Sequence, residues 1–224
     1  MSGQVRTIED LRGPAGRLEA VMNTGTQDAL YAAVVAHPHP LYGGTMHNKV
    51  VYHAAKAFNS FGLPTLRFNF RGVGLSEGEH ANGSGEIDDV RAAVDWMDRE
   101  FRLPILFAGF SFGSNIGFRA CCGDRRIAGL VGLGLPINAE GREYHYDFLP
   151  SCGPIPKLFV IGSEDAYAPR EQLERELAKA TDPKRTVWVK GADHFFAGTP
   201  QSPEPKLGVM SEAVRTWLSA SFGL

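Results

Sequence analysis

The stretch ILFAGFSFG, residues 105–113, leads from an apolar run into a serine between two glycines. The run Ile105–Phe110 predicts a strand buried on both faces, and Ser114–Cys122 predicts a short helix. In so tight a strand–turn–helix the glycines are needed, because a Cβ at either position would collide with neighbouring chain. A packed turn whose serine only caps the helix would explain the serine but not both glycines. We therefore expect the Ser111 hydroxyl at the carboxyl edge of a sheet, above a helix N-terminus that favours negative charge.

Apolar, β-branched runs alternate with segments of helical period along the rest of the chain, which indicates a mostly parallel sheet with helices on both faces. The first two strands could pair antiparallel at an edge. The expected strands are Val5–Ile8, Arg17–Met22, Leu30–Ala36, Thr65–Phe70, Ile105–Phe110, Ile127–Leu135, Lys157–Ile161 and Thr186–Lys190. The expected helices are Met46–Phe61, Glu86–Phe101, Ser114–Cys122, Arg170–Ala180 and Pro203–Phe222. Because no internal repeat or Pro/Ser-rich linker divides the 224 residues, the sequence predicts one doubly wound α/β domain over residues 1–224, with about eight strands.

Charge and cysteine usage exclude several classes of protein. Lys and Arg total 23 against 25 Asp and Glu, for a net charge of −2, and no basic run occurs, so a nucleic-acid partner is not expected. Residues 1–13 lack the apolar core of a signal peptide, and no stretch approaches about 18 uninterrupted apolar residues, so we expect a cytoplasmic protein without a membrane segment. The three cysteines, Cys121, Cys122 and Cys152, show no metal-ligand spacing. Neither a disulfide framework nor a structural zinc site is expected, and a reducing compartment fits.

Catalysis by Ser111 would need a histidine base and a carboxylate to orient it, because a serine hydroxyl is a weak nucleophile at neutral pH. Asp165 follows the expected strand Lys157–Ile161, and His194 follows Thr186–Lys190. Both lie beyond the carboxyl ends of parallel strands, at the same edge of the sheet as Ser111. The sequence therefore predicts Ser111 as nucleophile, His194 as base and Asp165 as orienting acid.

Two neighbouring carboxylates compete with Asp165 for this role. Glu164 is adjacent to it and would point away from the site, whereas Asp193 is too close in sequence to His194 to face its imidazole. Asp165 is preferred, since the orienting hydrogen bond depends on direction as much as on proximity.

Backbone N–H groups beside the serine are expected to form an oxyanion hole. One donor is the N–H of Phe112, and the second should come from the loop HPHPLYGGTMHNK, residues 37–49. The prolines of this loop cannot donate, and its two glycines allow close backbone approach. The second donor is therefore His39 or Leu41, with His39 preferred.

Neither a metal nor a cofactor is expected. His37 and His39 form an H-x-H pair, but prolines stiffen the segment and no carboxylate follows at metal-site spacing, so we expect them to bond to the backbone and shape the loop. The segment RGVGLSEG, residues 71–78, lacks the third glycine of a dinucleotide fingerprint, because Glu77 stands at that position. Its Arg71 is expected to bond nearby carbonyl groups.

Several motifs carry a family resemblance: GFSFG, SEDAYAP, GADHFF, HPHPLYGGTMHNKVV and LRFNFRGVGLSEG. These motifs resemble those of small, mostly bacterial α/β-hydrolase superfamily proteins, close to the dienelactone hydrolase-like and carboxylesterase-like branches. The resemblance runs from Leu30 to the C-terminus and implies a triad carried by Ser111, Asp165 and His194. Dienelactone hydrolases use a cysteine where Ser111 stands, and haloalkane dehalogenases use an aspartate, so neither reaction is expected.

Many members of that superfamily carry a cap domain after the sixth strand. Here about 20 residues, Pro136–Ile155, occupy that place, which implies little or no cap domain. An open site could then be rimmed by Tyr144, Tyr146 and Phe148.

These observations lead to the hypothesis of a serine hydrolase that cleaves small carboxylic esters or thioesters through an acyl-enzyme on Ser111. The alternatives are an acyltransferase or a peptidase with the same triad, and a non-catalytic binding protein that kept the fold, although a complete site speaks against the last. The expected partner is a small acyl ester rather than nucleic acid or a membrane, and the protein is expected to be a monomer or a homodimer.

Overall fold

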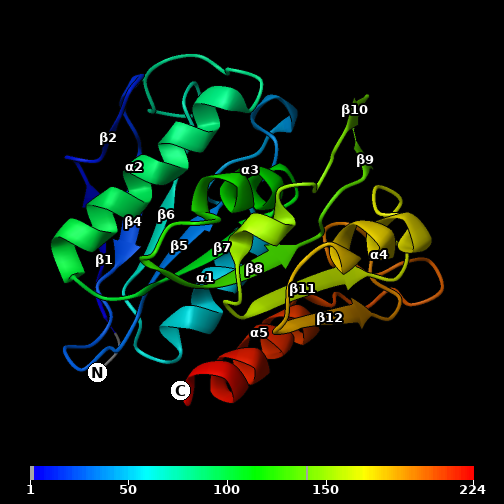
Figure 1. The fold of residues 1–224 in the computed structure, drawn as a ribbon. Coiled ribbons are helices and arrows are strands. Elements are labelled where there is room, and N and C mark those ends of the chain that lie inside the picture. Colours follow the sequence, from blue (N-terminus) through cyan, green and yellow to red (C-terminus); the bar gives the residue numbers. More distant parts are fainter. Residues whose placement is uncertain (1–2, 140) are drawn as a thin grey trace.

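An eight-stranded sheet runs through the centre of the computed structural model, which describes residues 3–139 and 141–224 (Figure 1). In spatial order its strands are β1 (Val5–Ile8), β4 (Ala20–Asn23), β6 (Thr65–Phe68), β5 (Ala32–Ala36), β7 (Ile105–Phe110), β8 (Ile127–Leu133), β11 (Lys157–Gly162) and β12 (Lys184–Val189). The β1–β4 and β4–β6 pairs are antiparallel, and all the other neighbouring pairs are parallel. The prediction of a doubly wound, mostly parallel sheet of about eight strands is confirmed, and so is the antiparallel edge.

Helices cover both faces of this sheet (Figure 1). One face carries α2 (Ser84–Phe101), α3 (Phe112–Cys121) and α4 (Arg170–Ala178), and the other carries α1 (Lys49–Asn59) and α5 (Leu207–Phe222). Successive residues of β5 alternate between the two cores: Ala32, Val34 and Ala36 face the first, and Ala33 and Val35 face the second. Because both faces are buried, every residue of this strand has to be apolar, and its sequence has no polar alternation.

The expected strand Arg17–Met22 is interrupted. A small hairpin precedes β4 and consists of β2 (Arg12–Gly13) and β3 (Gly16–Arg17). The interruption arises because the N–H of Arg17 donates to Glu77 Oε2 at 2.7 Å and the N–H of Glu19 donates to Ser76 Oγ at 2.9 Å. Side chains of the 71–78 loop thus replace a neighbouring strand at this point.

Helices α2 and α3 begin two residues earlier than the expected Glu86 and Ser114. Glu86 is the third residue of α2, and its carboxylate accepts the N–H of Gly83 at 2.7 Å, so the cap precedes it. Helix α3 begins at Phe112, directly after the serine of the turn. The turn is therefore tighter than the sequence pattern indicated.

A disulfide joins Cys122 to Cys152, so the expectation of no disulfide is wrong. It ties the end of α3 to the 3-10 turn η2 (Leu149–Cys152). The two cysteines are 30 residues apart, and it is the fold that brings their Cα atoms to 4.0 Å, a proximity that spacing along the chain does not reveal. The argument for a reducing compartment therefore falls away, whereas Cys121 is free and buried as a packing residue.

Short elements fill the segment between β8 and β11. A hairpin of β9 (Asn138–Ala139) and β10 (Arg142–Glu143) is followed by η2. In Figure 1 the hairpin projects beyond the carboxyl end of β8. The described part of this segment holds no insertion of domain size.

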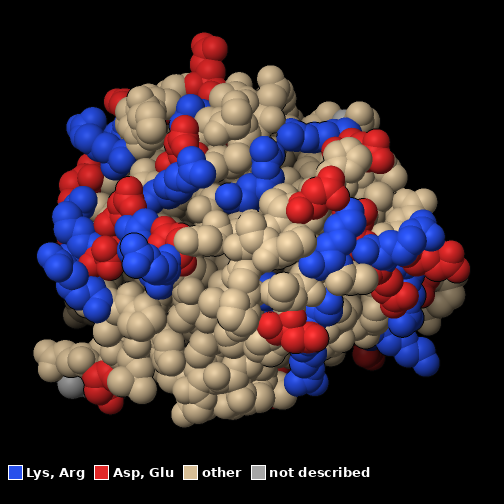
Figure 2. Space-filling view, viewed as in Figure 1, with Lys and Arg blue, Asp and Glu red and all other residues tan. Residues whose placement is uncertain are grey.

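Basic and acidic side chains are interspersed over the face seen in Figure 2, as the nearly balanced charge of the chain would suggest. Within residues 3–139 and 141–224, no helix has both the length and the apolar character needed to cross a membrane.

Candidate active site

The topology places the loops after β5 and β7 beside one crevice. These strands are parallel neighbours, but the chain leaves β5 toward β6 on one side and returns to β7 on the other. In doubly wound sheets, ligands bind at such a switch point, outside the carboxyl ends of the strands. Ser111 follows β7 and the loop beginning at His37 follows β5, so both lie at this point.

The backbone of Ser111 is strained. Its φ of 54° and ψ of −121° lie in a region that residues with a Cβ rarely adopt. A Cβ on Gly109 would overlap the carbonyl group of Gly113, and a Cβ on Gly113 would overlap the carbonyl oxygen of His37. Close contact among β7, α3 and the loop after β5 thus requires both glycines.

Ser111, His194 and Asp165 form one chain of hydrogen bonds. Nε2 of His194 lies 2.9 Å from Oγ of Ser111, and Nδ1 of His194 lies 2.8 Å from Oδ2 of Asp165. All three residues are buried, with exposed fractions of 6–7%. With a neutral imidazole, Nδ1–H donates to the carboxylate and Nε2 accepts from the hydroxyl, so the arrangement can remove the serine proton.

The carboxylate of Asp165 is held by its own loop. The N–H of Tyr167 donates to Oδ1 of Asp165 at 2.9 Å, which leaves Oδ2 for His194. Asp193 instead accepts two backbone N–H groups of its own loop, at 2.8 and 3.0 Å, and Glu164 is exposed. Of these three carboxylates, the structure brings Asp165 to the imidazole.

Aromatic rings surround the imidazole of His194. The ring centroids of Phe110, Tyr167 and Phe195 lie 5.1, 4.8 and 5.3 Å from it. These contacts restrict rotation of the imidazole, so its two nitrogens stay directed at their partners.

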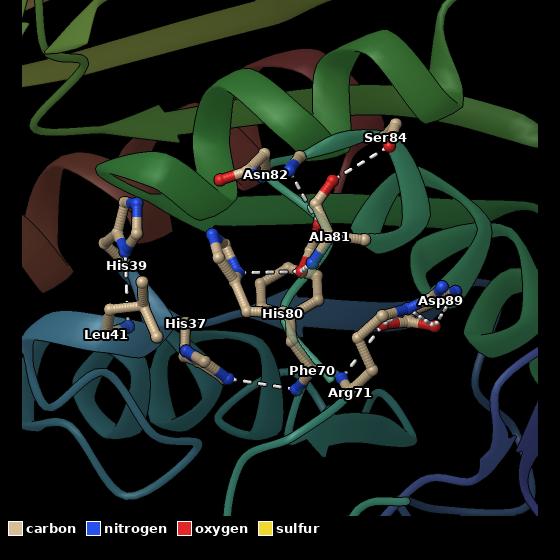
Figure 3. Close-up of polar contacts among 12 residues, drawn as sticks. His37, His39, Leu41, Phe70, Arg71, His80, Ala81, Asn82, Ser84 and Asp89 are labelled. Carbon is tan, nitrogen blue, oxygen red and sulfur yellow. Dashed lines mark hydrogen bonds and ion pairs between the residues drawn. The ribbon is translucent and has the colours of Figure 1, made fainter. Parts of the chain in front are cut away.

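The N–H groups of Phe112 and His39 have no acceptor among the described residues. Phe112 is the first residue of α3, and the first N–H groups of a helix have no partner within it. The N–H of Leu41, by contrast, donates to Nδ1 of His39 at 3.2 Å (Figure 3). The N–H of Leu41 is therefore already engaged, whereas that of His39 is not, and the ring of His39 packs 4.7 Å from the ring of Phe112. The choice of His39 as second donor stays a prediction.

The two histidines of the H-x-H pair bond to the backbone. Nδ1 of His37 lies 2.6 Å from the oxygen of Pro38, and Nε2 accepts from the N–H of Phe70 at 3.0 Å (Figure 3). Burial lowers the pKa of His37 to about 3, and burial with smaller effects of neighbouring charges lowers the pKa of His39 to about 4. Both imidazoles are therefore neutral at pH 7. No group of three or more potential ligands able to hold a metal ion occurs in the part of the chain that the structure describes.

A buried histidine–carboxylate pair beside this loop was not predicted. Nδ1 of His80 lies 2.8 Å from Oε1 of Glu86, whose carboxylate also accepts two N–H groups at the start of α2, at 2.7 and 2.8 Å. The ring of His80 lies 5.0 Å from that of His39 (Figure 3). It lies 5.9 Å from the ring of Phe112. The glutamate three residues after Gly83 was a signal for the start of the helix, but nothing in the sequence indicated the contact with His80.

The expected bonds from Arg71 to carbonyl groups do not occur among the described residues. Arg71 instead forms an ion pair with Asp89 of α2, with 2.7 Å between Nη2 and Oδ1, and its N–H donates to the same carboxylate at 3.0 Å (Figure 3). Burial raises the pKa of Asp89, although the hydrogen bonds from Arg71 oppose this shift. The pair fixes the glycine-containing loop at residues 71–78 to α2.

The expected aromatic rim is wrong for Tyr146. This side chain is fully buried and its hydroxyl donates to the oxygen of Pro136 at 2.9 Å. Tyr144 is also buried, and Phe148 is partly buried. The segment folds inward because Asn115 of α3 donates to the oxygen of His145 at 3.0 Å, which holds the chain against the helix.

Comparisons with known proteins agree with this architecture. A family model described as an alpha/beta hydrolase domain matches residues 32–221. An uncharacterised protein of Rickettsia prowazekii is 36% identical over 191 residues, which cover 82% of this chain and 79% of that protein. A solved structure described as an alpha-beta serine hydrolase homologue from Coxiella burnetii is 34% identical with a TM-score of 0.79, covering 96% of this chain and 97% of that one. A structure from Xanthomonas campestris, described as a serine hydrolase without lid, is 27% identical with a TM-score of 0.79, covering 97% and 94%.

Proposed function

The chain belongs to the alpha/beta hydrolase domain family, and on that premise we propose that it is a serine hydrolase cleaving small carboxylic esters or thioesters. The observation that carries the proposal is the continuous hydrogen-bonded chain from Ser111 Oγ through His194 to Asp165. Residues 1–224 would act as one catalytic domain.

In the first half of the reaction, Ser111 Oγ attacks the carbonyl carbon while Nε2 of His194 takes the hydroxyl proton. The carbonyl oxygen becomes an oxyanion that accepts hydrogen bonds from the N–H groups of Phe112 and His39. Asp165 accepts from Nδ1–H and stabilises the imidazolium. When the intermediate collapses, the bond to the alkoxide or thiolate breaks, and His194 returns the proton to that leaving group.

In the second half, water attacks the acyl-enzyme and gives its proton to His194. The acid product leaves, and the proton returns to Ser111 Oγ. Small substrates suit an open site, because the described part of the segment between β8 and β11 holds short elements and no insertion of domain size. The lidless description of the Xanthomonas campestris structure supports the same view.

The test is Ser111→Ala, measured by covalent labelling with a fluorophosphonate probe and by hydrolysis of p-nitrophenyl acetate. Both should be abolished, with the label in the wild type located on the peptide that contains Ser111. Ser211→Ala removes another buried serine hydroxyl, on α5, and should retain both activities. Wild-type labelling or hydrolysis by Ser111→Ala would refute the proposal, and product analysis with water and alcohol acceptors separates hydrolysis from acyl transfer.

A further inference from the structure

A partly buried arginine lies beside Phe112, the residue after the nucleophile. Arg142 belongs to β10, and its guanidinium carbon lies 5.7 Å from the ring centroid of Phe112 and 5.3 Å from that of Tyr144. One nitrogen, Nη2, donates to the backbone oxygen of Asn82 at 3.1 Å. The aromatic faces and this hydrogen bond fix the plane and the position of the cation.

Arg142 has no carboxylate at ion-pair distance among the described residues. The contrast with Arg71 is direct, since that side chain is held by Asp89. The buried acid of this region, Glu86, is already committed to His80 and to two backbone N–H groups. A guanidinium offers five N–H donors, so most of the donors of Arg142 remain available to a ligand.

Solvent can reach this cation. Arg142 lines an open groove along α3 together with Asn115, Arg119 and two acids, Glu143 and Asp147. Neither of these described acids forms an ion pair with Arg142, and Asp147 is paired with Lys179 at 2.7 Å. An anion could therefore bind to Arg142 without displacing a protein carboxylate, and the planar fork of the guanidinium matches the two oxygens of a carboxylate.

The two sides of Ser111 carry separate sets of rings. His194 contacts Phe110, Tyr167 and Phe195, whereas Phe112 contacts His39, His80 and Phe70. The leaving group must lie on the His194 side, because His194 returns the proton to it. Arg142 packs on the Phe112 set, the side of Ser111 away from His194, and we infer that the acyl group extends toward that side.

We propose that Arg142 binds a carboxylate at the far end of the acyl group, so that the preferred substrates are monoesters or monothioesters of dicarboxylic acids. This inference rests on the proposed hydrolase function. Arg142 would act by holding the substrate and would take no part in proton transfer.

The test compares two p-nitrophenyl esters of equal chain length, the pentanoate and the hydrogen glutarate, with rates corrected for uncatalysed hydrolysis. The measured quantity is the ratio of kcat/KM for the glutarate ester to that for the pentanoate ester. In Arg142→Gln this ratio should fall at least about tenfold, because a charge-assisted pair with the carboxylate is lost. Arg142→Lys keeps the charge without the planar fork and should give an intermediate ratio.

Arg91→Gln is the matched control, because it removes one positive charge from an exposed position on α2. An equal fall in this control would mean that net charge, rather than binding at Arg142, sets the ratio, and would overturn the inference. Equal losses on both esters in Arg142→Gln would also overturn it, since Arg142 would then only hold the hairpin. Suppose that the wild type is labelled on Ser111 and cleaves the pentanoate ester, and that Arg142→Gln has the same ratio as the wild type. That result would refute the inference and leave the hydrolase proposal standing. Absence of both labelling and hydrolysis refutes the two together.

Discussion

His194 and His37 are both buried, and each has contacts at both ring nitrogens, yet their partners differ in kind. The nitrogens of His194 face two side chains, the hydroxyl of Ser111 and the carboxylate of Asp165. Those of His37 face the backbone oxygen of Pro38 and the N–H of Phe70. A histidine bonded to a hydroxyl can take the proton it is offered, whereas protonating Nε2 of His37 would break a backbone hydrogen bond. The nature of the partners, rather than burial, separates a candidate base from a structural histidine.

The largest expected effect is that of His194→Ala on activity. Without the imidazole, Ser111 keeps its proton, and kcat/KM for p-nitrophenyl acetate should fall about 10⁴-fold. Circular dichroism and thermal unfolding should report a folded protein. Activity within tenfold of the wild type would mean that some other group removes the proton.

For His37→Ala we expect the reverse of His194→Ala: a large loss of stability and a small loss of activity. The N–H of Phe70 and the oxygen of Pro38 would be buried without a partner, so the free energy of unfolding should decrease by about 2–4 kcal/mol in urea denaturation. The loss of kcat/KM should be much smaller than in His194→Ala. If His37→Ala lost activity while keeping wild-type stability, the contrast between the two histidines would be wrong.

His39 offers a finer test of how the loop is held. Asn can replace the acceptor that Nδ1 presents to the N–H two residues ahead, as in an Asx-turn, whereas Phe keeps a ring against Phe112 but accepts nothing. If His39 acts by positioning its own N–H for the oxyanion, His39→Phe should lower kcat about tenfold with little change in KM, and His39→Asn should recover most of that loss. Equal activity of the two variants would exclude the positioning role of Nδ1.

The smallest expected effect is on stability between pH 7 and pH 6. An unfolded histidine, with a pKa of about 6.5, takes up protons over this range, whereas folded His37, with its pKa lowered to about 3, stays neutral. The unfolded state is therefore favoured as the pH falls, and His37 should lower the free energy of unfolding by about 0.7 kcal/mol. Urea denaturation gives the free energy of unfolding at pH 7 and at pH 6. The decrease between the two should be smaller for His37→Asn than for the wild type. An identical difference in the two proteins would argue against a neutral buried imidazole.

Local sequence patterns predicted the elements whose geometry is local. The strand Ile105–Phe110 agrees residue for residue, because a fully apolar run ends there at a strained turn. The meeting of Ser111, Asp165 and His194 followed from one rule, that parallel strands share a carboxyl edge. Their catalytic roles stay predictions.

Contacts between distant loops could not be predicted in this way. The disulfide Cys122–Cys152, the pair Arg71–Asp89 and the pair His80–Glu86 each depend on the path of a loop across a helix, which a residue pattern does not encode. Tyr146 illustrates the same limit: nothing in its neighbourhood along the chain indicated that its hydroxyl would turn inward to Pro136.

The positive φ of Ser111 has a consequence for the history of such a protein. Strain of this kind costs about 1–3 kcal/mol, and glycine would relieve it, although part of the gain would be offset by the greater freedom of glycine in the unfolded chain. Ser111→Gly would then yield a fold at least as stable, without the hydroxyl. Selection for stability alone would therefore not keep a serine at this turn. If the serine is kept, selection for the reaction must keep it.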